Sequence, residues 1–162
     1  MSHNHLFRLF VYGTLKRGYW NHEVYCRSAV FVEEVTVRGR LYELPSGIPV
    51  LRVPDSDILA VGTLDPLADV ATQERTPADL IVDAVRDETD WHMIRGEIIT
   101  LRDPQMSLPP IDQLEGFRGM HSTYRRVLVP AATGGSVLSV WCYVGCGSLI
   151  RNARPTNKTQ WP

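Results

Sequence analysis

The sequence predicts an α+β fold in which a mixed sheet curls toward closure. Strand-like segments outnumber helical ones, and the dipeptide Arg-Gly recurs at the same phase in two of them, Val37-Arg38-Gly39-Arg40-Leu41 and Ile94-Arg95-Gly96-Glu97-Ile98. A glycine inside a strand marks a place where two backbones approach closely, as at a bend or a barrel corner. With two or three short helices expected elsewhere, these patterns favour a curved sheet with helices beside it.

The composition is typical of a single globular domain spanning residues 1–162. A chain of 162 residues can bury about two-thirds of the surface that its unfolded form exposes. Its 17 basic and 18 acidic side chains give a formal charge of −1, which favours neither nucleic acid nor an anionic membrane as a partner. No apolar segment approaches the ~20 residues of a membrane helix, and the N-terminal residues lack the apolar core of a secretion signal. We therefore expect a cytoplasmic protein.

The three cysteines are interpreted as small packing residues. If Cys142 and Cys146 share one strand, four residues of rise separate them by ~13 Å, which is too far for a disulfide. A Cys-x₃-Cys pair without nearby histidines is also weak support for zinc. The same interpretation applies to Cys26, and the sequence predicts no metal site.

The first strand is predicted at residues 6–12, where only Arg8 interrupts an apolar run that ends at Gly13. Such a run fits a strand buried on both faces. Gly13 can adopt dihedral angles closed to other residues, so the amides that follow Tyr12 are expected to turn toward one point and hold an anion. An ordinary glycine turn is the alternative. A nucleotide phosphate loop is excluded, because Tyr19 and Trp20 follow where that motif requires Lys and Ser or Thr.

Periodicity predicts the elements that follow. Asn21 is expected to cap a short helix whose Val24 and Tyr25 side chains point inward. Residues 48–51 are expected to be an irregular apolar segment because of Pro49. The strand pattern recurs in four segments, the last two forming a hairpin: residues 31–44, 58–64, 124–131 and 136–144.

A helical elaboration is predicted at residues 65–92. A polar stretch leads to Thr76-Pro77-Ala78-Asp79, which combines a threonine cap, a proline in the first turn and an acid three residues on. An apolar stripe follows, so we expect a helix over residues 76–88 that lies outside the catalytic core.

A second short helix is predicted before Gly116. Pro109 ends one element, Pro110 starts the helix, and Gly116 is its C-terminal cap. Glu115 lies four residues after Ile111, at the edge of the apolar face. Partial desolvation there would raise its pKa into a range useful for proton transfer. The alternative is a solvated charge at a helix end.

Two blocks of the sequence resemble γ-glutamyl cyclotransferase-like proteins, especially the γ-glutamylamine branch. The first is Phe10-Val11-Tyr12-Gly13-Thr14-Leu15-Lys16-Arg17-Gly18, followed by Asn21-His22. The second is Ile111-Asp112-Gln113-Leu114-Glu115-Gly116-Phe117, followed by Tyr124-Arg125-Arg126. The resemblance spans residues 6–145 and implies a small mixed or antiparallel β-barrel with helices outside it.

The resemblance also implies a reaction, in which a γ-glutamyl group cyclises to 5-oxoproline and releases an amine or amino acid. This acyl transfer uses no cofactor, and its partner is a small-molecule γ-glutamyl substrate. Glu115 would be the general acid and base. We expect the substrate to contact Tyr12, Gly13, Thr14, Leu15, Tyr124 and Tyr143.

Several alternatives stay open. Tyr143 is either a wall of the cavity or a packed aromatic, and Arg126 is expected to pair with an acid in the barrel rather than with substrate. The chain could also be a non-catalytic small-molecule binding protein, or an interaction protein that uses residues 65–92. The sequence specifies no oligomeric state.

Overall fold

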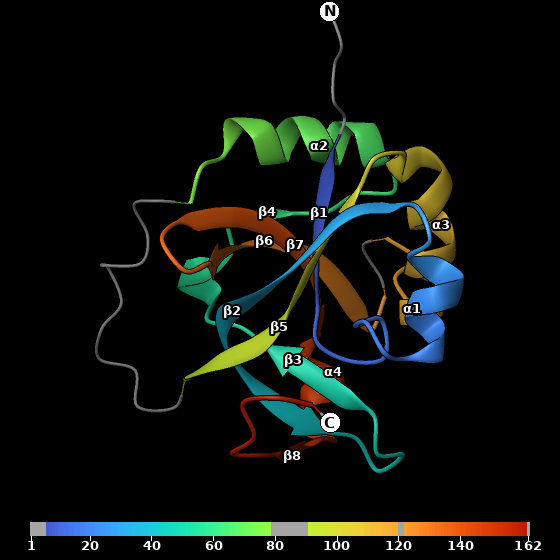
Figure 1. Cartoon of the computed structure of the whole chain (residues 1–162). Coiled ribbons are helices and arrows are strands. Elements are labelled where there is room, and N and C mark those ends of the chain that lie inside the picture. Colours follow the sequence, from blue (N-terminus) through green and yellow to red (C-terminus); the bar gives the residue numbers. More distant parts are fainter. Residues whose placement is uncertain (1–5, 79–90, 120–121, 162) are drawn as a thin grey trace, which may run out of the picture.

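The computed structural model describes residues 6–78, 91–119 and 122–161 (Figure 1). No helix in those ranges is long and apolar enough to cross a bilayer. In chain order the elements are β1 (Phe7–Val11), α1 (Trp20–Tyr25), β2 (Ala29–Glu43), β3 (Pro49–Arg52), a 3₁₀ turn (Asp55–Asp57), β4 (Ala60–Val61), α2 (Pro66–Arg75), β5 (His92–Leu101), α3 (Pro104–Glu115), β6 (Tyr124–Ala132), β7 (Val137–Gly145), α4 (Gly147–Arg151) and β8 (Arg154–Pro155).

Strands in the described residues close into a barrel with the order β2-β5-β1-β7-β6 and back to β2. Closure depends on the pairs Thr36↔Ala132 and Val37↔Ala131 between β2 and β6. Strand β1 runs antiparallel to β5 and parallel to β7, so the sheet is mixed. Helix α2 crosses one end of the barrel, and α1 and α3 lie together at its side (Figure 1). The predicted α+β class and the barrel implied by the family resemblance are confirmed.

The barrel separates two apolar cores, and β1 contributes to both. Phe10 and Tyr12 belong to the cluster inside the barrel. Leu9 and Val11 belong to a second cluster, which lies between the barrel and the helices and includes Trp141. Because alternate residues of a strand point to opposite faces, a strand between two cores carries apolar side chains on both faces, and in β1 only Arg8 departs from this pattern. The strand predicted at residues 6–12 is confirmed.

The two Arg-Gly strands approach other backbones closely, as predicted. A Cβ atom on Gly39 would lie 2.7 Å from the carbonyl oxygen of Arg52 in β3. A Cβ atom on Gly96 would overlap the carbonyl oxygen of Val11 and lie 2.7 Å from Cε1 of Phe10. These contacts leave room only for hydrogen, so both glycines are required where neighbouring strands meet.

Several predicted boundaries are wrong. Residues 49–52 form a regular strand, since Pro49 stands at its first position, where the missing N–H is tolerated. Of the strand expected at residues 58–64, only Ala60–Val61 forms. The N-cap of α1 is Tyr19 rather than Asn21, and Val24 is exposed.

Helix α3 also differs from the prediction, because it begins at Pro104 and continues through Pro109 and Pro110. Both prolines are exposed, as are Gln105 and Met106 one turn earlier. Water can therefore bind the carbonyl groups that lose a helical donor. The C-terminal cap is as predicted, since Gly116 adopts the left-handed conformation with φ of 78°.

The helix α2 occupies residues that were expected to form a polar connection. Asp65 caps it by accepting from the amide of Ala68 at 3.3 Å, and Pro66 occupies its first turn. Its buried face carries polar groups: Gln73 accepts from the Arg8 amide at 3.0 Å and donates to the Leu6 carbonyl at 2.9 Å. Apolar periodicity could not reveal such a face. The helix expected over residues 76–88 falls largely outside the described residues.

Candidate active site

A cavity of about 390 Å³ opens at the end of β1, between the barrel and α3. Its walls come from the loop after β1, the turn before β3, the end of α3, strands β6 and β7, and the C-terminal segment. The structure brings every predicted site residue to this cavity: Tyr12, Gly13, Thr14, Leu15, Glu115, Tyr124 and Tyr143.

The loop of residues 12–15 is held by its side chains and carbonyl groups. The hydroxyl of Tyr12 donates to the Tyr143 carbonyl at 2.9 Å. Asn21 Nδ2 donates to Thr14 Oγ1 at 2.7 Å, and His22 Nδ1 lies 2.8 Å from the Leu15 carbonyl oxygen. Within the described residues, the amides of positions 13, 14 and 15 bond to no acceptor. Three consecutive donors of this loop are thus without a partner among those residues.

The backbone of Gly13 corrects one expectation. Its φ is not positive, and the positive-φ glycine of this region is Gly18, at 96°. A Cβ atom on Gly13 would lie in ordinary contact, 3.7 Å from Cγ of Pro49. The free amides of the loop therefore do not depend on a left-handed glycine. They follow from the end of β1, since the register of β1 with β5 stops at Val11.

Glu115 is the last residue of α3 and is partly buried in the cavity wall. Burial, followed by the negative charge of Asp112 one turn earlier, raises the pKa of its carboxyl group from 4.5 to about 7. No hydrogen bond or ion pair joins Glu115 to another described residue. The carboxyl group is therefore desolvated yet unengaged, unlike a solvated charge at a helix end.

Tyr124 lies beside Glu115 as the first residue of β6. Its ring comes near the helix end, since a Cβ atom on Gly116 would lie 3.6 Å from Tyr124 Cδ2. Burial, followed by the charge of Glu115, raises the pKa of the Tyr124 hydroxyl. Tyr124 thus remains a neutral hydrogen-bond donor at the cavity wall at physiological pH.

Behind the cavity, Arg126 pairs with acids as expected, although these acids lie on helices. The fully buried guanidinium donates to Asp112 of α3 at 3.1 and 3.0 Å and to Asp69 of α2 at 2.6 Å. Asp112 also accepts from the hydroxyl of Tyr143. Tyr143 is therefore both a packed aromatic and part of the cavity wall. The ion pairs connect α2, α3 and the barrel directly behind Glu115.

Sequence reasoning missed several supporting residues. His22 is not among the predicted site residues, yet its ring contacts the loop carbonyl of Leu15. Asp112 could have been found, because it precedes Glu115 by three residues and therefore shares its side of the helix. Trp161 had no signal in the sequence, since its partner Lys16 lies 145 positions away.

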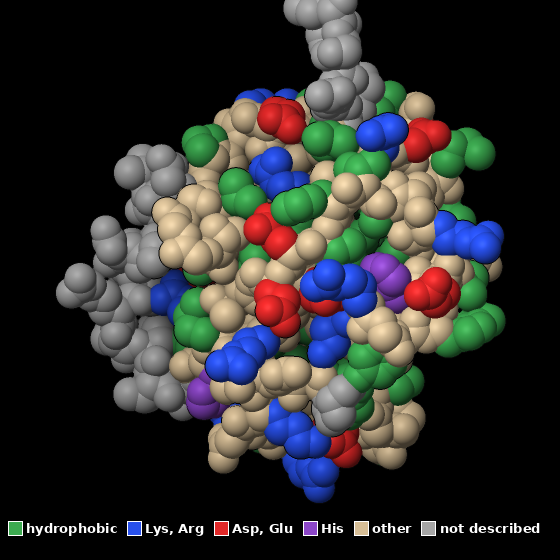
Figure 2. Space-filling model, in the orientation of Figure 1, with side chains coloured by type: hydrophobic (Ala, Val, Ile, Leu, Met, Phe, Trp, Pro, Cys, Tyr) green, Lys and Arg blue, Asp and Glu red, His purple; other side chains and the backbone are tan. Residues whose placement is uncertain are grey.

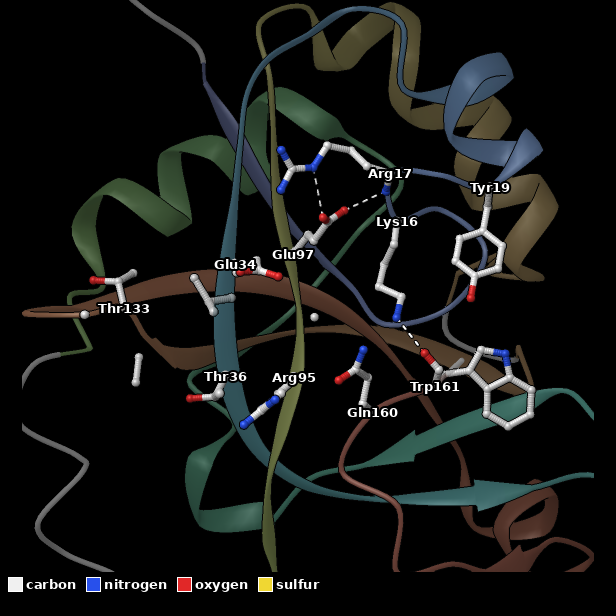
Figure 3. A pocket seen from close by; sticks show the side chains of 14 residues that line it. Lys16, Arg17, Tyr19, Glu34, Thr36, Arg95, Glu97, Thr133, Gln160 and Trp161 are labelled. Atoms are coloured by element: carbon white, nitrogen blue, oxygen red, sulfur yellow. Dashed lines mark hydrogen bonds and ion pairs between the residues drawn. The ribbon is translucent and has the colours of Figure 1, made fainter.

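A larger cavity of about 630 Å³ adjoins the first (Figure 3). Nζ of Lys16 donates to the Trp161 carbonyl oxygen at 2.7 Å, and Trp161 lines both cavities. The larger cavity contains Glu97, which accepts from Arg17 at 2.9 Å, but not Glu115. On the face shown in Figure 2, basic and acidic side chains are mixed.

The cysteines add no further site among the described residues. All three cysteines are free; Cys26 and Cys142 are buried, as a packing role requires, and Cys146 is partly exposed. Among the described residues, no three His, Cys, Asp or Glu side chains are placed to hold a metal ion together.

Comparisons with known proteins show what this chain is similar to. The family model described as "Gamma-glutamyl cyclotransferase, AIG2-like" matches residues 9–76, which include the loop after β1. No curated protein sequence matches the chain.

Two solved structures are similar to this chain. YkqA from Bacillus subtilis is 18% identical with a TM-score of 0.56; the match covers 96% of this chain and only 39% of YkqA. An aig2-like protein from Mus musculus is 17% identical with a TM-score of 0.50, over 98% of this chain and 89% of that one. At these identities the structures show a shared fold. Over residues 9–76 the chain is thus similar to the γ-glutamyl cyclotransferase, AIG2-like family, and over nearly its whole length it shares the fold of the two solved structures.

Proposed function

We propose that this protein cyclises a γ-glutamyl group to 5-oxoproline and releases the attached amine. The α-amine nitrogen attacks the γ-carbonyl carbon, a new C–N bond forms, and the original amide C–N bond breaks. The observation that carries the proposal is the position of Glu115, whose unengaged carboxyl group shares a cavity with the free amides of residues 13–15.

Glu115 supplies the proton transfers. Only a neutral amine is nucleophilic, so the carboxylate accepts one proton from the attacking ammonium group and later delivers one to the leaving nitrogen. A pKa of about 7 suits both steps, because efficient acid–base catalysts titrate near the working pH.

The loop of residues 12–15 orients the substrate. Its free amides are donors for the carboxylate of the γ-glutamyl group or for the oxygen of its γ-carbonyl. Holding the chain folded on itself places the amine near the carbonyl carbon, and such proximity supplies much of the rate.

The variant Glu115→Gln tests the proposal directly. Glutamine keeps the size and shape of the side chain but cannot accept the proton, so 5-oxoproline release falls by about 10²–10⁴-fold. The melting temperature and the binding of 5-oxoproline change little. Release is measured by chromatography over a panel of γ-glutamyl amines and peptides.

Glu23→Gln is the matched control, because Glu23 is exposed on the neighbouring helix α1. It retains wild-type turnover. Full activity in Glu115→Gln rejects the mechanism. A wild-type protein that binds 5-oxoproline but converts no member of the panel is instead a small-molecule binding protein.

A further inference from the structure

The cavity that contains Glu115 has an apolar rim, by which we mean the apolar lining residues that stay exposed or partly exposed: Ile48, Pro49, Leu114 and Trp161. Ile48 and Leu114 line the cavity, yet they remain 53% and 40% exposed. The rim residues come from the start of β3, the end of α3 and the C-terminal segment. Apolar side chains gathered at one opening gain free energy when a ligand covers them.

We propose that this rim is the subsite for the leaving amine and selects amines that carry an alkyl or aryl substituent. The inference rests on the cyclotransferase function proposed above. The γ-glutamyl group carries an ammonium and a carboxylate, whose partners are Glu115 and the amides of residues 13–15. The side chains of the rim carry no charge, and the indole N–H of Trp161 is their one hydrogen-bond donor. The rim therefore accepts the part of the substrate beyond the scissile nitrogen.

Trp161 is fixed at the rim from two directions. Lys16 holds its carbonyl oxygen (Figure 3), and Nζ of Lys158 lies 5.2 Å from the centroid of its ring. Beyond Trp161 lies the larger cavity, whose lining includes Glu34 and Glu97. Trp161 thus separates an apolar subsite from a polar one. Because Glu115 is engaged by the ammonium of the γ-glutamyl group, a cationic leaving amine would have to extend past the indole to reach Glu34 or Glu97.

Conjugates of matched size test the preference by calorimetric titration of the Glu115→Gln variant. They are γ-glutamyl-n-propylamide, its isostere γ-glutamylethanolamide, and the cationic conjugate of 1,2-diaminoethane. The propylamide is expected to bind on the order of tenfold more tightly than either isostere. Its affinity is expected to exceed that of γ-glutamylmethylamide by about 15-fold, because it buries two more methylene groups and each contributes about fourfold. Equal affinities, tighter binding of the diaminoethane conjugate, or no binding of any conjugate overturns the proposal.

The variant Leu114→Ser tests whether the rim causes the preference for apolar amines. It is expected to reduce the propylamide-to-methylamide affinity ratio by about fourfold or more. Met106→Ser is the matched control, since Met106 is 73% exposed on the same helix and does not line the cavity; it leaves the ratio unchanged. A Leu114→Ser protein with wild-type melting temperature and an unchanged ratio overturns the role of the rim.

The two proposals fail in different ways. If wild-type protein releases no 5-oxoproline from any conjugate, the cyclotransferase function is rejected. The affinities of the conjugates still show whether the rim prefers an apolar substituent. If all conjugates release 5-oxoproline and bind equally well, the function stands and the apolar selectivity is rejected.

Discussion

The carboxyl group of Glu115 titrates near neutrality because of where α3 ends. The helix terminates at Gly116, which leaves the side chain in the cavity wall rather than in bulk water. Burial contributes most of the rise in pKa to about 7, and Asp112 adds to it. Asp112 itself is held by Arg126 and Tyr143. The pKa of Glu115, on which the proposed proton transfers depend, is thus set in part by an acid of the buried ion pairs.

This raised pKa predicts how activity and stability vary with pH. Because only the ionised carboxylate accepts a proton, kcat/KM is expected to rise with pH and level off above about 7. The stability changes in the opposite direction. The folded state holds the proton of Glu115 more tightly than the unfolded state, so the contribution of Glu115 to the free energy of unfolding is greatest below about pH 4.5 and is lost as pH rises to about 7. The fall attributable to Glu115 is at most about 3 kcal/mol.

Glu115→Gln is the control for the stability profile. Urea titrations of both proteins between pH 4.5 and 8 give the difference in free energy of unfolding. The wild-type protein is expected to lose stability relative to the variant across this range. A difference that stays constant with pH contradicts the raised pKa.

At the scale of secondary-structure elements, α2 and α3 are attached to the barrel through one buried arginine. Arg126 of β6 contacts Asp69 on α2 and Asp112 on α3, and its guanidinium carbon lies 4.8 Å from the centroid of the Phe117 ring. The pairing also explains why α2 buries a carboxylate. These helices are positioned by charge and hydrogen bonds in addition to apolar packing.

Arg126→Met is therefore expected to destabilise the fold. It leaves two buried carboxylates without their partner, and breaking a buried ion pair in this way costs about 3–5 kcal/mol. The free energy of unfolding, measured by urea denaturation at pH 7, reports the loss.

Arg154→Met serves as the comparison, because Arg154 pairs with Glu43 at the surface with its side chain 75% exposed. Surface pairs of this kind contribute about 0.2–1 kcal/mol. Similar losses in the two variants would show that the Arg126 ion pairs do not hold the helices to the barrel.

At the scale of the whole molecule, barrel closure creates the cavity. Strand β1 lies between β5 and β7, and its pairing with β5 ends at Val11, where the chain turns into the cavity loop. Val11 pairs with Glu97 of β5, and Gly96, the residue before Glu97, lies directly against the Val11 carbonyl. Just beyond, Arg95 donates its amide to Thr159 at 2.7 Å, so the C-terminal segment continues the edge that β1 leaves.

Gly96→Ala is predicted to destabilise the closed barrel. Its Cβ atom would overlap the Val11 carbonyl and the Phe10 ring, and neither can move without separating β1 from β5. We expect a loss of at least about 2 kcal/mol, within the range of overpacked cores. Gly134→Ala is the control, because nothing lies within 4 Å of its Cβ position and its φ is not positive. Equal denaturation midpoints for the two variants would contradict this account of closure.

The sequence by itself determined the features that depend on neighbouring positions. The apolar run of β1, the hairpin of β6 and β7, the Gly116 cap and the placement of Glu115 on the last turn of a helix follow from short spacings and local propensities. The two sequence blocks also indicated the barrel and the residues that line the cavity.

Tertiary structure decided what depends on contacts between distant residues. Helix α2 was not predicted because its buried face carries Asp69 and Gln73, whose partners lie on β6 and near the start of β1. Trp161 reaches the cavity through Lys16, and no spacing in the sequence encodes that pair. The titration of Glu115 likewise depends on which surfaces exclude water from it. Local patterns specify elements, whereas burial and long-range pairing exist only once the barrel has closed.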